Sequence, residues 1–181
     1  AFFNELDSFA ISKDLNSRDI IEGLSFDSRI GNYYNNPSFG FGGYCLPKDI
    51  KELERHLPES TNIVVNATSL SNSQRKAFIA KDIIRKSNGV IGIYRLLSKD
   101  NNDNFRNSAV IDIINLLLKE QREIIIFEPE IIGNSFLEVP IISDFKEFKE
   151  KSSLIVCNRS RGDFEGYERK LYSRDIFKRD T

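Results

Sequence analysis

The opening residues follow the period of an amphipathic α-helix. The apolar positions recur at steps of three and four and are Phe2, Phe3, Leu6, Phe9 and Ala10. A second short helix is predicted over residues 18–24, because Asn16 and Ser17 supply a cap before it and Gly23 a stop.

The remaining pattern predicts an α/β protein. We expect helices over residues 48–57, 60–86, 106–119 and 144–149, and strands over residues 90–95, 123–127, 141–142, 153–158 and 170–173. Strands and helices alternate after residue 87, and the strand interiors hold few polar residues, which is typical of a parallel sheet covered on both faces. The prediction is a helical segment over residues 1–86 that leads into an α/β domain over residues 87–181.

Composition and charge exclude several classes of protein. The 181 residues include 26 Lys and Arg against 27 Asp and Glu, so the formal net charge of −1 gives no electrostatic basis for binding nucleic acid. The longest apolar runs are far shorter than the roughly 20 residues needed to cross a bilayer. The two cysteines lie far apart, unlike a disulfide scaffold. We expect a soluble protein of the cytoplasm that binds neither nucleic acid nor membrane.

The first residues suggest where the chain comes from. Ala1 is followed at once by the predicted helix, with no initiator Met and no signal peptide, and the sequence contains no Met at all. We therefore expect the C-terminal piece of a longer protein.

Residues 31–49 carry the clearest functional signal, because glycine, asparagine and proline are concentrated there. A glycine-rich loop exposes backbone amides that suit a phosphate. Cys45 stands just ahead of Pro47, at or beside the N-cap of the predicted helix, where the helix dipole and Lys48 favour a thiolate. Asp49 follows one helical turn later, close enough to orient a water molecule. This arrangement points to a nucleophilic cysteine.

Other candidate sites are weaker. Cys157 lies inside an apolar strand and is interpreted as a small buried residue. His56, the single histidine, ends a charged helix and is interpreted as a partner of the helix dipole, so a Cys-His protease pair would depend on it alone. Two cysteines and one histidine at these spacings do not make a metal site. No Gly-x-Gly-x-x-Gly turn follows the strand over residues 90–95, so the dinucleotide fingerprint is missing.

Residues 35–49, which read Asn-Asn-Pro-Ser-Phe-Gly-Phe-Gly-Gly-Tyr-Cys-Leu-Pro-Lys-Asp, resemble the catalytic-cysteine segment of bacterial UDP-glucose 6-dehydrogenases, of the UDP-glucose/GDP-mannose dehydrogenase family. Residues 3–7, 94–106 and 172–177 agree with the same family, in family order. The resemblance therefore extends across essentially the whole chain.

The resemblance implies an NAD-dependent enzyme with an N-terminal Rossmann domain, a central dimerisation helix and a Rossmann-like C-terminal domain that holds the UDP-sugar. Such enzymes oxidise UDP-glucose to UDP-glucuronate and form homodimers. By resemblance, Cys45 attacks the intermediate aldehyde, the resulting thiohemiacetal is oxidised to a thioester, and Asp49 positions or deprotonates the water that releases the product.

The resemblance also assigns binding residues by position. Those expected near the UDP-sugar are Tyr34, Asn35, Asn36, Pro37, Ser38, Gly42 and Lys99, with Arg29 presented to the neighbouring subunit's sugar. Tyr44, Lys48 and Arg106 are expected near the NAD. Independently of the resemblance, Arg159 follows the end of the predicted strand over residues 153–158, where open α/β sheets bind ligands. The family's catalytic lysine and asparagine lie upstream of residues 3–7, so we expect this chain alone to bind UDP-sugar weakly and to catalyse nothing.

Two alternatives stay open. The chemistry of the cysteine loop is shared with GDP-mannose and UDP-N-acetylhexosamine dehydrogenases. The sequence Tyr-Asn-Asn-Pro-Ser at residues 34–38 favours UDP-glucose. The chain could also be a non-catalytic module for nucleotide-sugar binding or dimerisation.

Overall fold

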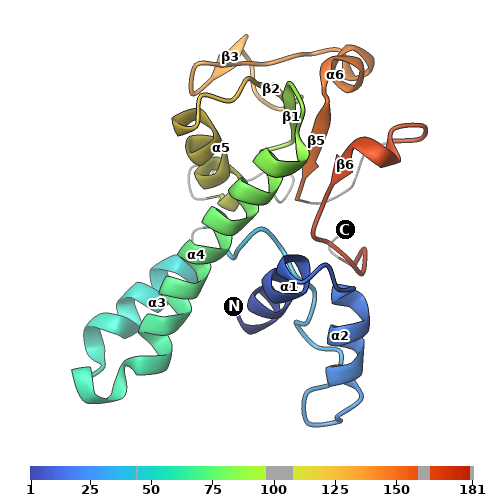
Figure 1. The fold of residues 1–181 in the computed structure, drawn as a ribbon. Coiled ribbons are helices and arrows are strands. Elements are labelled where there is room, and N and C mark those ends of the chain that lie inside the picture. The colour runs from blue at the N-terminus through green and yellow to red at the C-terminus, as the bar shows by residue number, and fades with distance from the viewer. Residues whose placement is uncertain (44, 97–107, 159–163, 180–181) are drawn as a thin grey trace.

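A computed structural model describes residues 1–43, 45–96, 108–158 and 164–179 (Figure 1). The helices are α1 (Phe2–Ser12), α2 (Ser17–Ser25), α3 (Cys45–His56), α4 (Ile63–Lys86), α5 (Ala109–Lys119) and α6 (Phe145–Lys151), with single 3-10 turns η1 (Glu59–Thr61) and η3 (Glu168–Lys170). The strands are β1 (Ile91–Tyr94), β2 (Ile124–Phe127), β3 (Ser135–Phe136), β4 (Val139–Pro140), β5 (Leu154–Cys157) and β6 (Leu171–Tyr172).

Four of these strands form a parallel sheet in the order β2-β1-β5-β6. The register pairs Ile91 with Ile124 on one side and with Leu154 on the other. The central strands are buried along their whole length, as a parallel sheet covered on both faces requires. The predicted fold class, a helical segment followed by a parallel α/β domain, is confirmed.

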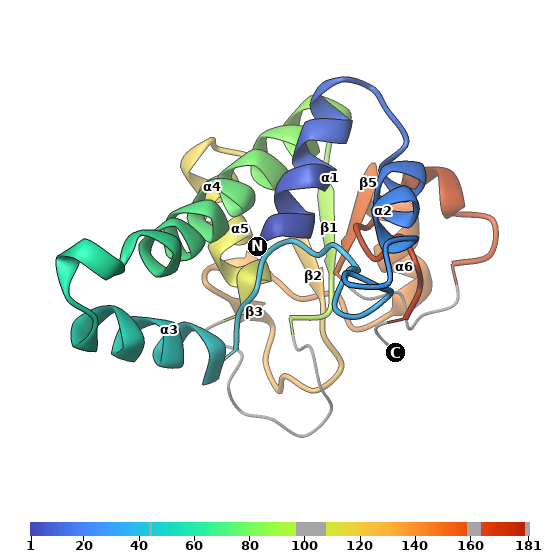
Figure 2. The same cartoon turned by 90° about the horizontal axis from the view of Figure 1, so that it is seen from below.

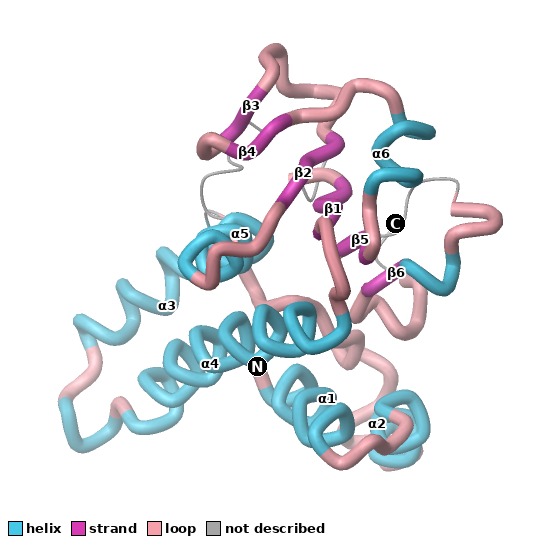
Figure 3. Tube along the Cα trace, turned by 45° about the horizontal axis from the view of Figure 1, so that its top comes forward, coloured by secondary structure: helices cyan, strands magenta, loops and turns pink. Residues whose placement is uncertain are grey.

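Two hydrophobic clusters lie on opposite faces of the sheet. Ile91 and Ile93 point into the cluster formed with α4 and α5, whereas Tyr94 and Ile155 join the one covered by α6. Each fully buried aliphatic side chain contributes roughly 1.5–3 kcal/mol. Figure 3 shows the sheet between α5 and α6, with α4 running past it into the helical part.

Gly92 explains how closely α6 packs. A Cβ at this position would lie 2.1 Å from Ser152 Oγ and 2.9 Å from two ring atoms of Phe148. Only glycine lets the end of α6 approach β1 this closely.

The helical part is built around α4, whose 24 residues run unbroken. Helix α3 folds back along the N-terminal half of α4, and the two project away from the sheet (Figure 1). Helix α1 packs on the same long helix and on α2. The C-terminal half of α4 belongs to the sheet core through Ile79 and Ile83. A domain boundary between residues 86 and 87 stays a prediction.

Several local predictions are refined. Asn16 caps α2 as expected, accepting a hydrogen bond from the Arg18 N–H at 3.0 Å, but the helix continues past Gly23 to Ser25. The predicted helix over residues 48–57 begins earlier, at Cys45. The predicted edge strand over residues 170–173 is β6.

The predicted strand over residues 141–142 is wrong. Ile141 makes a single parallel bridge to Ile126, and the extended segment is instead the β3-β4 hairpin. Its turn places Leu137 and Glu138 at positive φ, without the glycine or asparagine that usually marks such turns, so the pattern gave no signal for it.

Candidate functional site

Cys45 is the first residue of α3, and it is exposed. Pro47 falls in the first helical turn, where its missing N–H breaks no hydrogen bond. Lys48 and Asp49 are exposed on the same turn, with 3.3 Å between Lys48 Nζ and Asp49 Oδ1. The thiol, an ammonium and a carboxylate therefore stand together at the positive end of a helix, open to an incoming ligand.

Helix α3 has no buried residue. Its distal half is tied to α4 through Glu54: the backbone C=O accepts a hydrogen bond from Asn62 Nδ2 at 2.9 Å, and the carboxylate accepts one from Ser69 Oγ. The position of Cys45 therefore depends on these polar contacts and on the loop before it.

That loop runs from α2 past the N-terminal end of α1 to α3, as Figure 2 shows. At its centre, Asn4 of α1 accepts a hydrogen bond from the Ser38 N–H at 2.8 Å. The Ser38 C=O accepts two from the Arg75 guanidinium of α4, at 3.0 and 2.9 Å. Two helices thus fix the backbone at Ser38.

Asn72 of α4 holds the next part of the loop by both of its amide atoms. Its Oδ1 accepts from the Phe41 N–H, and its Nδ2 donates to the Phe41 C=O, each at 2.9 Å. Gly40 makes this possible: its φ is +141°, and a Cβ there would lie 2.8 Å from Asn72 Oδ1.

The start of the loop is tied to the C-terminal segment. Asn36 Nδ2 donates to Asp175 Oδ1 at 2.6 Å, and its Oδ1 accepts from the Phe177 N–H at 3.4 Å. The buried Asn35 donates to Ser25 Oγ at 2.9 Å. Residues more than 130 positions apart in sequence are therefore held in register at this point.

Phe39 anchors the loop in the sheet core. Its side chain is fully buried and stacks on Tyr172, with ring centroids 5.9 Å apart. Its N–H donates to the side chain of Asn158, just beyond β5, at 3.4 Å. The loop is therefore continuous with the carboxyl ends of the strands, the edge at which open α/β sheets bind ligands.

Behind the loop lies a sealed ionic cluster. Asp7 of α1 is fully buried and accepts hydrogen bonds from the guanidinium groups of Arg75 and Arg174. Burial by itself would raise the pKa of Asp7, but the hydrogen bond from Arg174 and the charges of the two arginines outweigh it, so the pKa lies below its ordinary value. The cluster joins α1, α4 and the segment after β6.

A second buried carboxylate, that of Asp82, ties the end of α4 to β6. Asp82 is buried and pairs with Arg85 at 2.6 Å and Lys86 at 2.8 Å, while Tyr172 Oη donates to it at 2.9 Å. Burial opposes ionisation, but these donors and cations lower the pKa of Asp82 overall. Burial and the neighbouring carboxylate raise the pKa of Tyr172.

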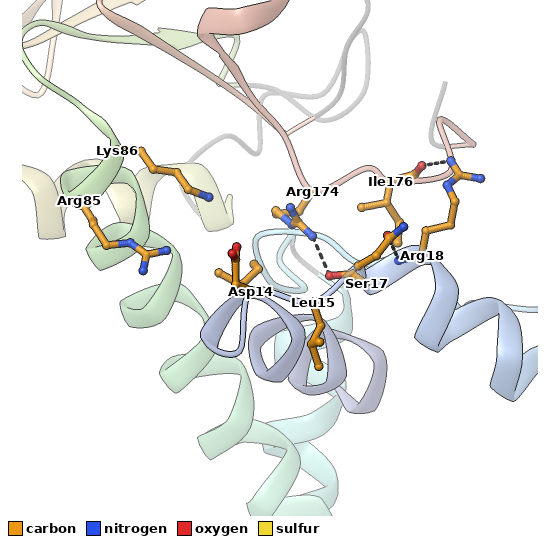
Figure 4. Close-up of a pocket in the computed structure, with 10 residues that line it drawn as sticks. Asp14, Leu15, Ser17, Arg18, Arg85, Lys86, Arg174 and Ile176 are labelled. Carbon is orange, nitrogen blue, oxygen red and sulfur yellow. Dashed lines mark hydrogen bonds between the residues drawn. The ribbon is translucent and has the colours of Figure 1, made fainter.

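A cleft of about 420 Å³ lies between the α1–α2 connection, the end of α4 and the segment after β6. Figure 4 shows the residues that line it. Its basic lining residues already have carboxylate partners: Arg85 and Lys86 pair with Asp82, Arg174 with Asp7, and Arg18 with Glu22. Arg85 lies 13 residues beyond Asn72 on α4, a rise of about 20 Å. The cleft is thus a charge-balanced seam, away from Cys45.

The other residues predicted from sequence have varied positions. Pro37 is buried and Gly42 half-buried in the loop. Tyr34 is fully exposed with a φ of +49°. Arg29 is exposed beside Asp27 and lowers the pKa of that carboxyl by hydrogen bonding. Tyr44, Lys99, Arg106 and Arg159 lie outside the described residues.

Sequence reasoning missed Asn4, Asp7, Asn72 and Arg75. A signal for the last two was present, since Asn72, Arg75, Ile79 and Ile83 continue one helical face, and all four are buried. A polar pair that extends an apolar stripe predicts buried side chains with partners elsewhere.

Within the described residues, no group of three or more His, Cys, Asp or Glu side chains is placed to hold a metal ion. No helix in the same part of the chain is long and apolar enough to span a membrane.

With this geometry in place, comparison with known proteins identifies the family. Residues 1–74 match the central domain of the UDP-glucose/GDP-mannose dehydrogenase family, and residues 92–179 match its UDP binding domain. The chain belongs to this family. The resemblance drawn from the cysteine loop is confirmed.

Two relatives are both UDP-glucose 6-dehydrogenases. The one from Campylobacter jejuni is 47% identical over 178 residues, which is 97% of this chain and 45% of the relative. The one from Streptococcus pneumoniae is 44% identical over 179 residues, 99% of this chain and again 45% of the relative. This chain therefore spans about half the length of the relatives it matches.

A solved structure shares the fold at lower identity. The UDP-glucose dehydrogenase from Pyrobaculum islandicum superposes with a TM-score of 0.69 at 20% identity, over 99% of this chain and 45% of that one.

Proposed function

We propose that this chain is the C-terminal part of an NAD-dependent UDP-glucose 6-dehydrogenase, in which Cys45 is the nucleophile. The observation that carries the proposal is an exposed cysteine at the first residue of a helix, after a glycine-rich loop that Asn72 of α4 holds at Phe41. The identity of 47% and 44% to two UDP-glucose 6-dehydrogenases supports the choice of substrate over GDP-mannose or a UDP-N-acetylhexosamine.

In the proposed reaction, the C6 alcohol of UDP-glucose is first oxidised to an aldehyde. Cys45 Sγ then bonds to the aldehyde carbon and the carbonyl oxygen takes up a proton, giving a thiohemiacetal. Loss of a hydride from the same carbon and of the hydroxyl proton then yields a thioester, in the second oxidation. Water attacks the thioester, the thiolate leaves, and UDP-glucuronate is released. A thiolate suits both steps, because it is a strong nucleophile and a good leaving group.

Lys48 and Asp49 have separate roles in this proposal. Lys48 is exposed on the same helical turn as Cys45 and offers a cation to an anionic group of the ligand. Asp49 orients the hydrolytic water or accepts its proton, since it is exposed one turn after Cys45.

NAD accepts the hydride in both oxidations when it is bound. Among the described residues, Lys48 is the one predicted cofactor contact, and its exposed side chain fits an anionic group at the edge of the site. The chain therefore contributes the border of the cofactor site, and we propose that the family's NAD-binding half supplies the rest. Accordingly, the 181-residue chain alone should not turn over UDP-glucose.

The decisive experiment restores the NAD-binding half of a close relative upstream of this chain and follows NADH. We expect UDP-glucose to be oxidised with two NADH per sugar, because alcohol to acid is a four-electron change. Cys45→Ser should stop the reaction before hydrolysis, whereas Cys157→Ser should not, since Cys157 is buried in β5. Full turnover by Cys45→Ser would overturn the mechanism.

The substrate is tested by calorimetry on the chain itself. Heat with UDP-glucose but not with GDP-mannose supports the proposal, and the reverse favours the GDP-mannose alternative. Heat with neither would contradict a sugar-nucleotide site in this part of the protein.

We also propose that the α3–α4 hairpin pairs with a second copy of the chain. Its exposed large apolar side chains are Leu46, Leu53, Ile63, Val64 and Leu70. Apolar surface gathered on a projecting hairpin is typical of a self-association face. Sedimentation should give a dimer for the parent and a monomer for Ile63→Glu with Leu70→Glu; a monomeric parent would refute the pairing.

A further inference from the structure

We propose that Asn72 is a positioning residue that determines where the Cys45 thiol stands. The effect of the thiol's position on catalysis rests on the proposed function. The position of the thiol itself follows from the geometry of this chain.

The first step concerns what holds α3. No residue of α3 is fully buried, and only Pro47 and Ile50 near its start are half-buried, so apolar packing by itself holds the first turn weakly. Cys45, Lys48 and Asp49 are all exposed. The start of the helix must therefore take its position from tethers on either side of it.

The distal tether is Glu54, which Asn62 and Ser69 hold against α4. It lies nine residues after Cys45, at the far end of a helix whose axis it constrains in only one place. A helix held at one end can still tilt about that end. A second tether near its beginning is needed to place the thiol.

The proximal tether is the clamp between Asn72 and Phe41, four residues before Cys45. One primary amide satisfies both backbone groups of Phe41, at 2.9 Å each, so it fixes the orientation of that residue as well as its place. Asn72 is nine-tenths buried or more, which protects both hydrogen bonds from competition by water.

Gly40 and the stem of Lys76 close the clamp from the other side. The position that a Gly40 Cβ would take lies 2.8 Å from Asn72 Oδ1 and 3.3 Å from two carbons of Lys76. Asn72 also begins the buried stripe of α4 that ends in the sheet core. The position of the thiol is therefore tied, through Phe41 and Asn72, to the long helix α4, which is anchored in the sheet core.

The test uses the 181-residue chain and site-resolved mass spectrometry, which separates Cys45 from the buried Cys157. The variants are Asn72→Ala, which removes both hydrogen bonds, and Asn72→Asp, which keeps the shape and the acceptor but loses the donor. Asn66→Ala is the matched control, because Asn66 is exposed on the same helix. Thermal denaturation first establishes a temperature at which each variant is folded.

We expect amide exchange at Phe41 to rise about fivefold or more in Asn72→Ala, the scale set by one or two net hydrogen bonds. Alkylation of Cys45 by iodoacetamide should slow by a similar factor, because the thiol moves away from the N-terminal amides of α3, which favour negative charge. Asn72→Asp should also differ from the parent in both measurements, because its carboxylate cannot donate to the Phe41 C=O, and Asn66→Ala should match the parent.

Faster exchange at Phe41 with unchanged alkylation of Cys45 would overturn the inference, as would no change in either. If Asn72→Ala does not fold, the isosteric Asn72→Asp decides by the same two measurements. With the NAD-binding half restored and rates normalised to the folded fraction of each variant, Asn72→Asp should lower kcat more than it raises KM for UDP-glucose.

The two proposals can fail separately. Alkylation of Cys45 and amide exchange at Phe41 can be measured without turnover. If both change as expected but the restored enzyme makes no NADH, the positioning role of Asn72 stands and the proposed reaction is rejected.

Discussion

Two acid–base pairs in this molecule have opposite environments. Asp7 and Arg75 are sealed behind the loop, with side chains 0% and 2% exposed, whereas Asp49 and Lys48 at the start of α3 are 63% and 55% exposed. An exposed pair adds little stability because water and salt screen it. A buried pair becomes costly when one partner is removed. The sealed pair therefore maintains the architecture, and the exposed pair remains available to a ligand.

The contrast is sharpest for Asp7→Asn. This change leaves the buried guanidinium group of Arg75 and the half-buried one of Arg174 without their counter-ion, so we expect the free energy of unfolding to fall by about 3–5 kcal/mol. Urea denaturation measures it. Asp49→Asn is the control and should leave the midpoint unchanged; equal effects of the two changes would abolish the distinction.

Acid should weaken the contacts made by the two buried carboxylates, Asp7 and Asp82. Because the folded-state pKa values of Asp7 and Asp82 lie below the unfolded value of 3.8, their stabilising effect is present above that value and is lost as the pH falls through the folded values. The loss should be smaller than that from Asp7→Asn, since a protonated carboxyl keeps some hydrogen bonds. Denaturation from pH 6 down to pH 2 tests this, and a pH-independent midpoint in that range would contradict it.

The loop itself can be strained without touching a charge. Gly40→Ala places a Cβ 2.8 Å from Asn72 Oδ1 at a φ of +141°, so it should cost about 1–3 kcal/mol. Gly23→Ala is its matched control within α2, where nothing lies within 4 Å, and should stabilise the protein by about 0.5–1 kcal/mol. Opposite signs in thermal denaturation are expected; a destabilised Gly23→Ala would show that α2 is packed more tightly than the structure indicates.

The smallest effect concerns Tyr172. Replacing it with Phe removes one hydrogen bond to Asp82 while the cations of Arg85 and Lys86 remain, so the cost should be about 1 kcal/mol. Urea denaturation at pH 7 is the measurement. A cost as large as that of Asp7→Asn would place Tyr172 among the essential members of the ionic clusters.

Much of the fold was predictable because it follows from local periodicity. The short apolar runs at β1, β2 and β5 and the long stripe of α4 all gave correct element types. The β3-β4 hairpin was missed because Leu137 and Glu138 carry no turn signature. The order of the strands could not be read from the chain, since pairing is a long-range property.

The candidate site divides in the same way. The residue types and spacing over residues 35–49 predict a reactive cysteine, and Cys45 is exposed at a helix start as that pattern implies. The residues that hold the loop could not be assigned, because Asp7 meets Arg75 and Arg174 at separations of 68 and 167 residues. In the sequence, neither Arg75 nor Arg174 can be distinguished from an ordinary charged residue on the surface.

By itself, the order of residues determined the helices, the parallel strands, the family and the segment that carries the thiol, because each is encoded within a few turns or strands of chain. Tertiary structure alone decided which polar side chains are sealed and which remain open. Burial depends on segments that meet only after folding. It makes a carboxylate and a guanidinium into a structural tie at Asp7 and Arg75, whereas the pair formed by Asp49 and Lys48 stays exposed to solvent.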